Sequence, residues 1–345
     1  MREFRIPEKL FKQVIMTLRN TTAKVKIQGE FSKEFIISRG LRQGDILSTQ
    51  LFNLVLKFVI RKIDINKGGT IFNRLLHLLG YADDVDILSR NLTELKEAFK
   101  TFEVESKKVG LIVNEDKTKY MINTRNKVRF RHLDHLEIGN YQFERVSQFK
   151  YLGTVIDENS DGSVEIKARI AAGNRCFYSL LGVFKSAVVS RHTKKALYRT
   201  IVRPVVLYGA ESWCLTARET ERLEVWERKI LRKIYGPICD NGEWRIRTNL
   251  QLKTLYKEPG IVTEIKRARL RWIGHLERMS NERSTKKIYS NKPEGCRQVG
   301  RPRLRWIDDV RTDIRRLGVR NWKAKAQDRK GWKKLLSEAK VLHGP

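Results

Sequence analysis

The chain has 345 residues, and its 41% hydrophobic and 9% aromatic residues suffice to build folded cores, so the composition excludes a disordered polyelectrolyte. Lys and Arg number 71 against 39 Asp and Glu, which gives a formal net charge of +32. Such an excess of charge repels itself unless a polyanion neutralises it, and nucleic acid is the usual polyanion. We find no long uncharged apolar run, signal peptide or lipidation motif, and we therefore expect no membrane partner.

The first elements are predicted to be a helix, a hairpin and a second helix. Residues 6–20 carry an apolar stripe at helical spacing. Residues 21–40 alternate apolar and lysine side chains around Gly29, which is typical of a β-hairpin. Ser48 is predicted to cap the next helix. The buried side of that helix is expected to use Leu51, Leu54, Val55, Phe58 and Val59.

Two adjacent aspartates, Asp83 and Asp84, lie between short apolar runs in the stretch LLHLLGYADDVDILS, residues 75–89. This pattern predicts a strand, a turn and a second strand. Tyr81 and Val85 are expected to anchor the flanks, while Asp83 projects outward. That geometry suits Mg²⁺, which takes few protein carboxylates and completes its shell with water and phosphate oxygens. An ordinary solvated turn is the alternative, because Asp is common in turns.

The next segments change from mixed to helical character. Residues 92–110 predict a helix, and residues 149–157 predict a strand that bends at Gly153. After Gly162 the apolar residues recur at helical spacing. We therefore expect strands to mix with helices before about residue 157 and helices to dominate afterwards.

Thr216 and Glu219 form a capping box that opens a helix ending at Gly236. Its buried face is expected to use Leu223, Trp226, Ile230 and Ile234. Beyond it, residues 261–345 hold 24 Lys and Arg against 9 Asp and Glu. Tryptophans in this basic region are expected to lie in a core, with stacking on unpaired bases as the alternative. They are Trp272, Trp306, Trp322 and Trp332.

The four cysteines lie far apart and show neither a CxxC pair nor the spacing of a zinc site. We expect free thiols in a reducing, intracellular compartment. The sequence does not choose between nucleus and cytoplasm. The four are Cys176, Cys214, Cys239 and Cys296.

Four blocks, in order and at their spacing, resemble reverse transcriptases of non-LTR (LINE-type) retrotransposons. They are RGLRQGDILSTQLFNLVL at 39–56, YADD at 81–84, GLIVNEDKTKYM at 110–121 and FKYLGTVID at 149–157. Together the blocks are highly specific. The resemblance covers nearly the whole chain, since three later segments look like the thumb and basic tail of insect-type elements. These segments are residues 201–213, 270–279 and 300–311.

The resemblance implies catalytic roles for three residues. Asp83 would be the main ligand of a catalytic Mg²⁺, with Asp84 supporting it. Lys117 would donate a proton to the leaving pyrophosphate or lie beside it as a cation, and a solvated lysine is the alternative. The residues implied to bind nucleotide and template are Arg42, Gln43, Gly44, Tyr81 and Asn114.

The resemblance also implies two kinds of nucleic-acid contact. The primer grip would be formed by Phe149, Tyr151, Leu152 and Gly153. Phosphate-binding cations of the helix 217–235 and of the tail would be Arg222, Lys229, Lys233, Arg301, Arg303 and Arg305. A plain core strand and a solvated helix face are the alternatives to these two roles.

One part of the family pattern does not occur in the sequence, namely an upstream strand with a third catalytic carboxylate. The chain begins where that strand should already have passed. We therefore expect an N-terminally truncated copy that holds Mg²⁺ weakly and polymerises little or nothing alone. The sheet edge beside YADD is expected to be unpaired.

The predicted fold class is α+β. Residues 1–157 would form a partial right-hand polymerase palm, an antiparallel sheet with helices, residues 158–236 a helical thumb, and residues 237–345 a basic, mostly helical C-terminal region. The predicted function is RNA-directed DNA synthesis with Mg²⁺, an RNA template, a DNA primer and dNTPs, without evidence of an oligomer. The alternatives are a non-catalytic RNA/DNA-binding remnant of a retroelement and a maturase-like splicing cofactor.

Overall fold

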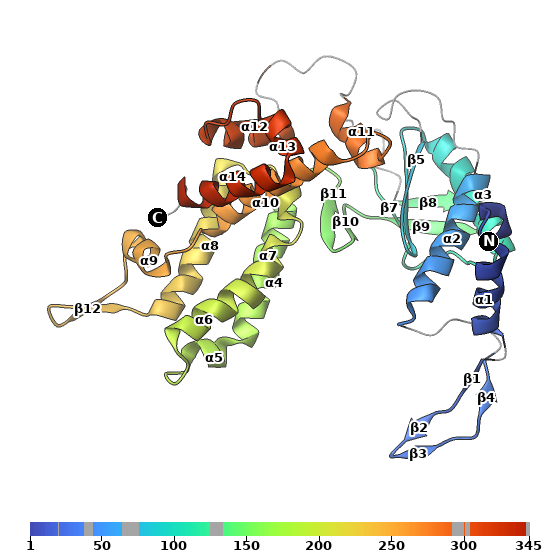
Figure 1. The fold of residues 1–345 in the computed structure, drawn as a ribbon, viewed down its shortest axis with the longest axis horizontal. Helices are drawn as coiled ribbons and strands as arrows, with labels where there is room; N and C mark the ends of the chain where they lie inside the picture. The colour runs from blue at the N-terminus through green and yellow to red at the C-terminus, as the bar shows by residue number, and fades with distance from the viewer. Residues whose placement is uncertain are drawn as a thin grey trace. The chain divides into compact units, whose positions relative to one another are not determined.

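The computed structural model describes residues 1–19, 21–37, 44–63, 76–124, 134–291, 300 and 304–342. Helices and short, mostly antiparallel strands make up the fold, which is α+β as predicted (Figure 1). The contacts divide the chain into two compact units. Of the described residues, the N-terminal unit holds those up to 118 and residues 136–143, and the helical unit holds the rest.

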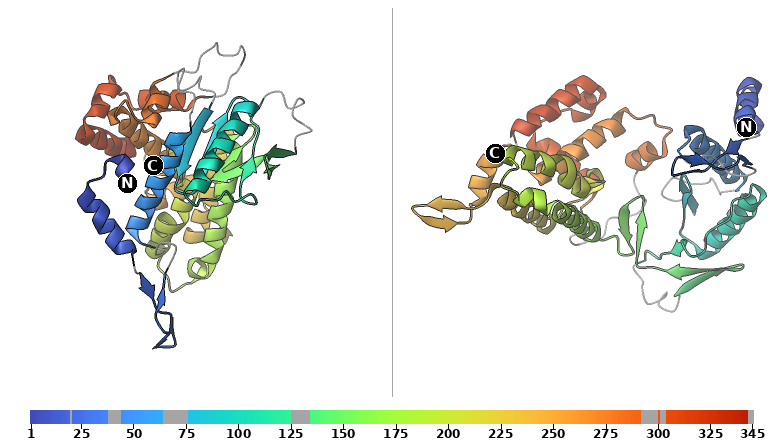
Figure 2. Two further views of the ribbon diagram at one scale, coloured as in Figure 1. Left: turned by 90° about the vertical axis from the view of Figure 1, so that its right-hand side faces the viewer. Right: turned by 90° about the horizontal axis from the view of Figure 1, so that it is seen from below.

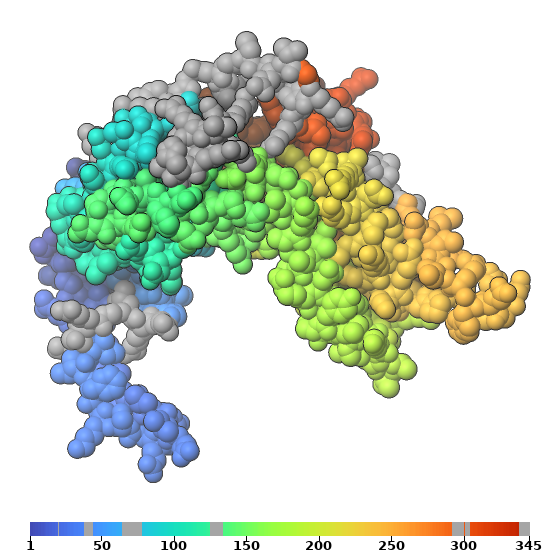
Figure 3. Space-filling model, turned by 180° about the vertical axis from the view of Figure 1, so that it is seen from behind, coloured from blue at the N-terminus to red at the C-terminus, as the bar shows by residue number. Residues whose placement is uncertain are grey.

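The N-terminal unit begins with the predicted helix and hairpin. Helix α1 spans Glu8–Leu18, and none of its residues is buried. The hairpin pairs β1 (Thr22–Ala23) with β4 (Phe35–Ile36), and β2 (Lys26–Ile27) with β3 (Glu30–Phe31). Gly29 lies in its turn with a φ of 95°, which confirms the predicted turn position. Figure 3 shows this hairpin, in blue, projecting from its unit.

Helix α2 spans Ile46–Lys62 and begins at a different cap from the predicted one. The Asp45 carboxylate accepts the Leu47 N–H at 2.9 Å, whereas the Ser48 hydroxyl donates to the Asp45 carbonyl at 2.6 Å. The prediction of Ser48 as the cap is therefore wrong. Asp45 supplies a favoured cap oxygen three residues earlier, and Ser48 already lies in the first turn.

The acidic segment forms an antiparallel hairpin of β5 (Leu76–Tyr81) and β6 (Asp84–Ser89). This β5–β6 hairpin lies against α2 and against α3, which spans Leu92–Lys108 (Figure 2). At Gly80 a Cβ would lie 3.5 Å from the Leu56 side chain, so α2 packs directly on β5. Of the five residues predicted for the buried side of α2, only Val59 is fully buried.

A three-stranded sheet follows α3 in the chain. Its strands are β7 (Lys119–Tyr120), β9 (Tyr141–Arg145) and β8 (His135–Ile138), in that order. The ring of Phe99 on α3 meets the ring of Phe143 on β9 edge-on, with 5.0 Å between the centroids. The buried apolar residues of the unit are Leu56, Val59, Ile63, Ala98, Phe99, Leu136, Ile138 and Phe143.

A second hairpin, β10 (Gln148–Tyr151) and β11 (Thr154–Asp157), precedes the helices of the helical unit. Helical segments follow: α4 (Gly162–Ser179), α5 (Leu181–Lys185), α6 (Arg191–Leu197), η3 (Tyr198–Val202), α7 (Arg203–Leu207), η4 (Ala210–Ser212) and α8 (Ala217–Tyr235). The remaining helices are α9 (Asn249–Tyr256), α10 (Ile261–Arg278), α11 (Ser284–Ser290), α12 (Trp306–Arg316), α13 (Trp322–Gln327) and α14 (Arg329–Leu342).

Helix α8 confirms the predicted cap and the predicted buried face. The Glu219 N–H donates to the Thr216 hydroxyl at 3.3 Å, and the Thr216 N–H donates to the Glu219 carboxylate at 2.7 Å. The four predicted residues are buried: Leu223, Trp226, Ile230 and Ile234. One apolar core runs from Ile166 to Ile265 and so continues past residue 236. The division of this region at residue 236 stays a prediction.

A second core holds the basic C-terminal helices together. Trp332 is buried in it, and its indole N–H donates to the Leu270 carbonyl at 3.0 Å. The core position predicted for the tryptophans is thus confirmed for Trp332, while Trp272, Trp306 and Trp322 are half-buried against the same core. Arg269 on α10 is buried beside it and forms ion pairs with Asp309 and Asp313 on α12.

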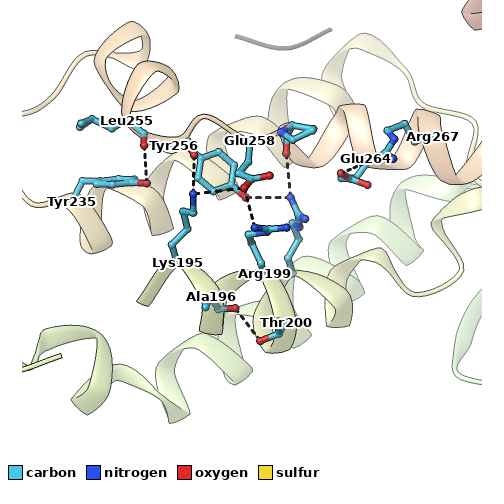
Figure 4. A network of polar contacts seen from close by, with 12 residues as sticks. Lys195, Ala196, Arg199, Thr200, Tyr235, Leu255, Tyr256, Glu258, Glu264 and Arg267 are labelled. Carbon is cyan, nitrogen blue, oxygen red and sulfur yellow. Dashed lines mark hydrogen bonds and ion pairs between the residues drawn. The ribbon is translucent and has the colours of Figure 1, made fainter. Parts of the chain in front are cut away.

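A polar network fixes the segment between α9 and α10 to the helices below it (Figure 4). Glu258 pairs with Arg199 at 2.9 Å and with Lys195 at 3.6 Å. The Lys195 ammonium also donates to the Tyr256 carbonyl at 3.3 Å. These contacts use the positive charges of α6 and η3 within the protein.

The sequence analysis missed a hairpin of β12 (Ile238–Asp240) and β13 (Glu243–Arg245). Asn241 and Gly242 form its turn with φ values of 51° and 88°. An Asn-Gly pair at this spacing is a strong hairpin signal, so the sequence did contain the information. The hairpin, in orange, projects from the helical unit in Figure 3, and Trp244 on it is 73% exposed.

Two further predictions concern the chain as a whole. Cys176, Cys214 and Cys239 are free thiols as predicted, and Cys296 lies outside the described residues. Burial raises the pKa of the Cys214 thiol to about 11. Within the described ranges, none of the helices combines the length and the apolar character needed to cross a membrane.

Candidate active site

The β5–β6 hairpin has the strand, turn and strand that the sequence predicts. Tyr81 pairs with Asp84, so Ala82 and Asp83 form the turn, and Asp84 is the first residue of β6. Ala82 has a φ of 53°, a conformation that costs a residue with a Cβ about 1 kcal/mol or more. The sequence therefore holds a strained backbone at the point where its two carboxylates meet.

Asp83 and Asp84 are both exposed, and within the described part of the chain neither forms an ion pair or a side-chain hydrogen bond. Two free carboxylates are notable in a chain of net charge +32. Asp86 is half-buried, and burial raises its pKa, with the charge of Asp84 adding to the rise. A cation beside the turn would relieve this accumulation of negative charge.

The donor set of the turn fits Mg²⁺ held loosely, with water and phosphate oxygens completing the shell. Among the residues that the structure describes, no group of three or more His, Cys, Asp or Glu side chains could hold a metal ion. Two adjacent carboxylates would therefore bind an ion best together with a phosphate ligand.

The flanks of the hairpin differ from the expectation. Tyr81 is 65% exposed, so its expected role as an anchor by packing is wrong. Tyr81 is the last residue of β5 and lies directly beside the two-residue turn. Leu79 and Leu88 are also about half exposed, at 45% and 50%. In the described structure, β5 and β6 pair only with each other.

The segment between α3 and β7 forms a tight turn around Asn114. Its side-chain carbonyl accepts the Lys117 N–H at 3.0 Å, and its backbone carbonyl accepts the Thr118 hydroxyl at 2.7 Å. Glu115 fixes the same turn by accepting the Gln142 N–H. Asn114 thus shapes the turn that presents Lys117. The Lys117 side chain is exposed, and within the described residues its ammonium forms neither an ion pair nor a hydrogen bond.

Of the residues predicted to bind nucleotide and template before α2, only Gly44 is described. It has a φ of 88° and no atom within 4 Å of where a Cβ would be, so the backbone conformation itself requires glycine. Arg42 and Gln43 lie outside the described residues, as do Arg301 and Arg303 of the tail. Arg305 is described and exposed just before α12.

The predicted primer grip is the β10–β11 hairpin, and Leu152 and Gly153 form its turn with φ values of 46° and 82°. The backbone carbonyl groups of both turn residues accept hydrogen bonds from side chains of the helical unit. The Tyr208 hydroxyl donates to the Leu152 carbonyl at 2.9 Å, and the Arg169 guanidinium donates to the Gly153 carbonyl. Phe149 and Tyr151 are half-buried on β10.

A buried charge pair holds this arrangement. Glu165 is 4% exposed, accepts the Val155 N–H of β11 at 2.7 Å and pairs with Arg169 at 2.6 Å. The Arg169 guanidinium also lies 4.5 Å above the centre of the Tyr208 ring. The sequence analysis missed these three residues. The only signal was a Glu and an Arg four positions apart on a helix, which is common on solvated helices.

We expect Tyr208→Phe to loosen the hairpin tip while leaving the ring below Arg169. The lost hydrogen bond should cost about 0.5–1.5 kcal/mol locally, seen as amide exchange of β10 and β11 that is faster by roughly twofold to tenfold. Tyr178→Phe on α4 is the matched control, because Tyr178 is 65% exposed. Equal exchange rates in both variants would refute the anchoring role.

The cations predicted to contact phosphates on α8 lie away from its buried face. Lys229 and Lys233 are exposed, and Arg222 is half-buried. Their spacing of seven and four residues places them along one side of the helix. The structure thus leaves a row of positive charge on α8 that the core does not use.

The N-terminal part of the chain matches the model of a known protein family. The family model described as reverse transcriptase (RNA-dependent DNA polymerase) matches residues 1–156. This range contains the acidic hairpin, the Asn114 turn and the β10–β11 hairpin. Residues 1–156 therefore belong to the reverse transcriptase family, whose members copy RNA and generally use divalent metal ions.

Two relatives of this chain come from a retrotransposable element and a transposon. A Pol polyprotein of an R2 retrotransposable element from Nasonia vitripennis is 25% identical over 178 residues, which is 50% of this chain and 17% of that protein. A probable RNA-directed DNA polymerase from transposon BS of Drosophila melanogaster is 25% identical over 224 residues, 61% of this chain and 24% of that protein.

A third relative has a similar length. The chain is 25% identical over 270 residues to a putative uncharacterized transposon-derived protein of Caenorhabditis elegans, covering 75% of this chain and 94% of that protein. The chain thus spans nearly all of this relative but a quarter or less of the two retrotransposon polymerases.

Proposed function

We propose that this chain takes part in RNA-directed DNA synthesis, in which a DNA 3′ end is extended with dNTPs on an RNA template. One observation carries the proposal. Asp83 and Asp84 stand exposed and unpaired at the turn of an antiparallel hairpin, inside the segment that the reverse transcriptase family model matches. In a chain of net charge +32, a solvated turn would more readily have attracted a lysine or arginine.

Each element would have a definite task in this reaction. Asp83 and Asp84 would hold Mg²⁺ against the phosphates of the incoming nucleotide. The ion, when bound, lowers the pKa of the attacking 3′-hydroxyl and stabilises the leaving pyrophosphate. Lys117, presented by the Asn114 turn, would supply a positive charge or a proton to that pyrophosphate.

Nucleotide and template would pass beside Gly44 and Tyr81, where a residue without a Cβ and an exposed ring leave the backbone accessible. The β10–β11 hairpin would hold the primer end with Phe149 and Tyr151, on a tip made rigid by the helix contacts. Residues 1–157 would then be the palm, residues 158–236 the thumb, and residues 237–345 a basic nucleic-acid-binding region.

The cation row of α8, with Arg222, Lys229 and Lys233, would track the phosphates of an RNA–DNA hybrid. Arg305 would add to this contact from the tail. Binding by such charges releases counterions, so it should weaken steeply as salt rises. Salt dependence alone does not separate a polymerase from a protein that only binds nucleic acid.

Primer extension on an RNA template tests the proposal. With Mg²⁺ and dNTPs, any extension should depend on Asp83 and should be removed by Asp83→Asn, because the amide cannot replace the carboxylate as a metal ligand. Clear Asp83-dependent extension would contradict the expectation that this chain polymerises little or nothing alone. Glu97→Gln is the matched control, since Glu97 is an exposed carboxylate on α3 and its loss should leave extension unchanged. Salt-sensitive hybrid binding without Asp83-dependent extension would favour a non-catalytic RNA/DNA-binding protein instead.

A further inference from the structure

The helical unit contains a hollow of about 510 Å³, and the proposed function uses only one of its lining residues, Lys233. It lies between α5, the loop before α6, the first turns of α6 and the C-terminal end of α8. Its floor is apolar, with Phe184 2% exposed and Ile234 3% exposed. Four cations line it, Lys185, Arg191, Lys194 and Lys233, and no acidic side chain does.

The four cations fall into two groups. Lys194 is buried, and its ammonium donates to the Ser186 carbonyl at 2.7 Å, so it fixes the loop between α5 and α6. Lys185, Arg191 and Lys233 are exposed. In the parts of the chain that the structure describes, none of these three forms an ion pair or a side-chain hydrogen bond.

Two neighbouring cations on the same helical stretch, unlike the three around the hollow, are paired with an acidic side chain. Lys195 and Arg199, on the same helical stretch, are both paired with Glu258 (Figure 4). The protein therefore neutralises positive charge on one side of α6 and leaves it unneutralised around the hollow. The three exposed cations around the hollow repel one another, and a bound anion would offset the free energy of that repulsion.

The end of α8 accounts for part of this arrangement, but not for all of it. Lys233 lies in the last turn of the helix, where a cation interacts favourably with the free carbonyl groups. Lys185 likewise lies in the last turn of the short α5, but Arg191 opens α6, so the same explanation does not cover Arg191. Because three separate elements contribute, the hollow is suited to an anion that several groups contact at once.

We propose that this hollow binds a phosphodiester group of a nucleic-acid strand. Lys185, Arg191 and Lys233 would contact the phosphate oxygens, and the apolar floor formed by Phe184 and Ile234 would exclude water from one side. Lys229 lies one turn before Lys233 on α8, so the strand can continue along that helix. The site extends the proposed nucleic-acid binding of α8, and it is separate from the acidic hairpin.

The test uses the full chain and the anisotropy of a short, labelled RNA–DNA hybrid across a salt series. The triple variant Lys185→Gln, Arg191→Gln, Lys233→Gln should bind about tenfold more weakly, or worse. Its slope of log affinity against log salt should fall by about two to three. The control triple is Lys167→Gln, Arg175→Gln, Lys253→Gln, which removes the same charge from exposed positions elsewhere on the helical unit. The control triple should lose much less affinity for the hybrid than the triple variant at the hollow.

Equal losses in the two triples would overturn the proposal, because binding would then depend on net charge alone. The charge-retaining triple Lys185→Arg, Arg191→Lys, Lys233→Arg should bind nearly as well as the original chain, and failure to do so in a folded protein would also overturn it. Inorganic phosphate competing as strongly as the hybrid would identify a site for free anions instead. Extension activity is not part of this readout, so a chain that extends no primer can still meet the prediction.

Discussion

Arg269→Ala is expected to destabilise the C-terminal core by about 3–5 kcal/mol. The Arg269 side chain is 3% exposed and pairs with Asp309 at 2.7 Å and with Asp313, whose side chain is 6% exposed. Removing the guanidinium leaves the Asp313 carboxylate buried without a counter-charge. The two ion pairs also join α10 to α12 through residues that are 40 and 44 positions apart in the chain.

The measurement is urea unfolding followed by tryptophan fluorescence, since the C-terminal core contains several tryptophans. Arg228→Ala is the control, because Arg228 pairs with Glu224 on α8 with side chains 26% and 46% exposed. A pair of that kind contributes about 0–1 kcal/mol. If the two substitutions cost the same, the buried ion pair does not hold these helices together.

Gly173→Ala is expected to destabilise the first core of the helical unit. A Cβ at Gly173 on α4 would lie 2.4 Å from a methyl group of Val206 and 2.8 Å from the Trp226 ring. Neither neighbour can move cheaply. Val206 is stiff because it is β-branched and fully buried, and the Trp226 indole is fixed by its hydrogen bond to Asn174 at 2.9 Å.

Gly182→Ala provides the comparison, because Gly182 lies in helix α5 with nothing within 4 Å of its Cβ position. Alanine there should gain up to about 1 kcal/mol from helix propensity, whereas overpacking at Gly173 should cost about 1–3 kcal/mol. Thermal unfolding should therefore separate the two variants by about 2–3 kcal/mol. Similar stabilities would mean that α4 does not approach α7 and α8 as closely as described.

The sequence predicted well where a local pattern decides the structure. The capping box of Thr216 and Glu219 and the apolar stripe of α8 depend on residues within one or two turns, and both are confirmed. The acidic hairpin was predicted as a strand, a turn and a strand, but the residues of its turn were not predicted. In this hairpin Tyr81 pairs with Asp84. Both strands carry short apolar runs, and these runs alone do not determine which residues of the two strands pair.

Features that depend on distant residues could not be predicted in this way. Glu165 and Arg169 read as an ordinary surface pair on a helix, and only the approach of Tyr208 and the β10–β11 turn makes them a buried anchor. The hollow beside α6 also depends on residues that are distant in the sequence, since Lys185 and Lys233 are 48 residues apart. In a lysine-rich chain, nothing in the composition distinguishes these lysines from the others.

The anchored tip of the β10–β11 hairpin has a mechanical consequence. A two-residue turn with two left-handed residues already matches the twist of the strands, and here its carbonyls are also attached to α4 and to Tyr208. A load applied to the strand end is therefore transmitted into the helix bundle, and the bend does not absorb it. The hairpin and α4 would act together as a lever.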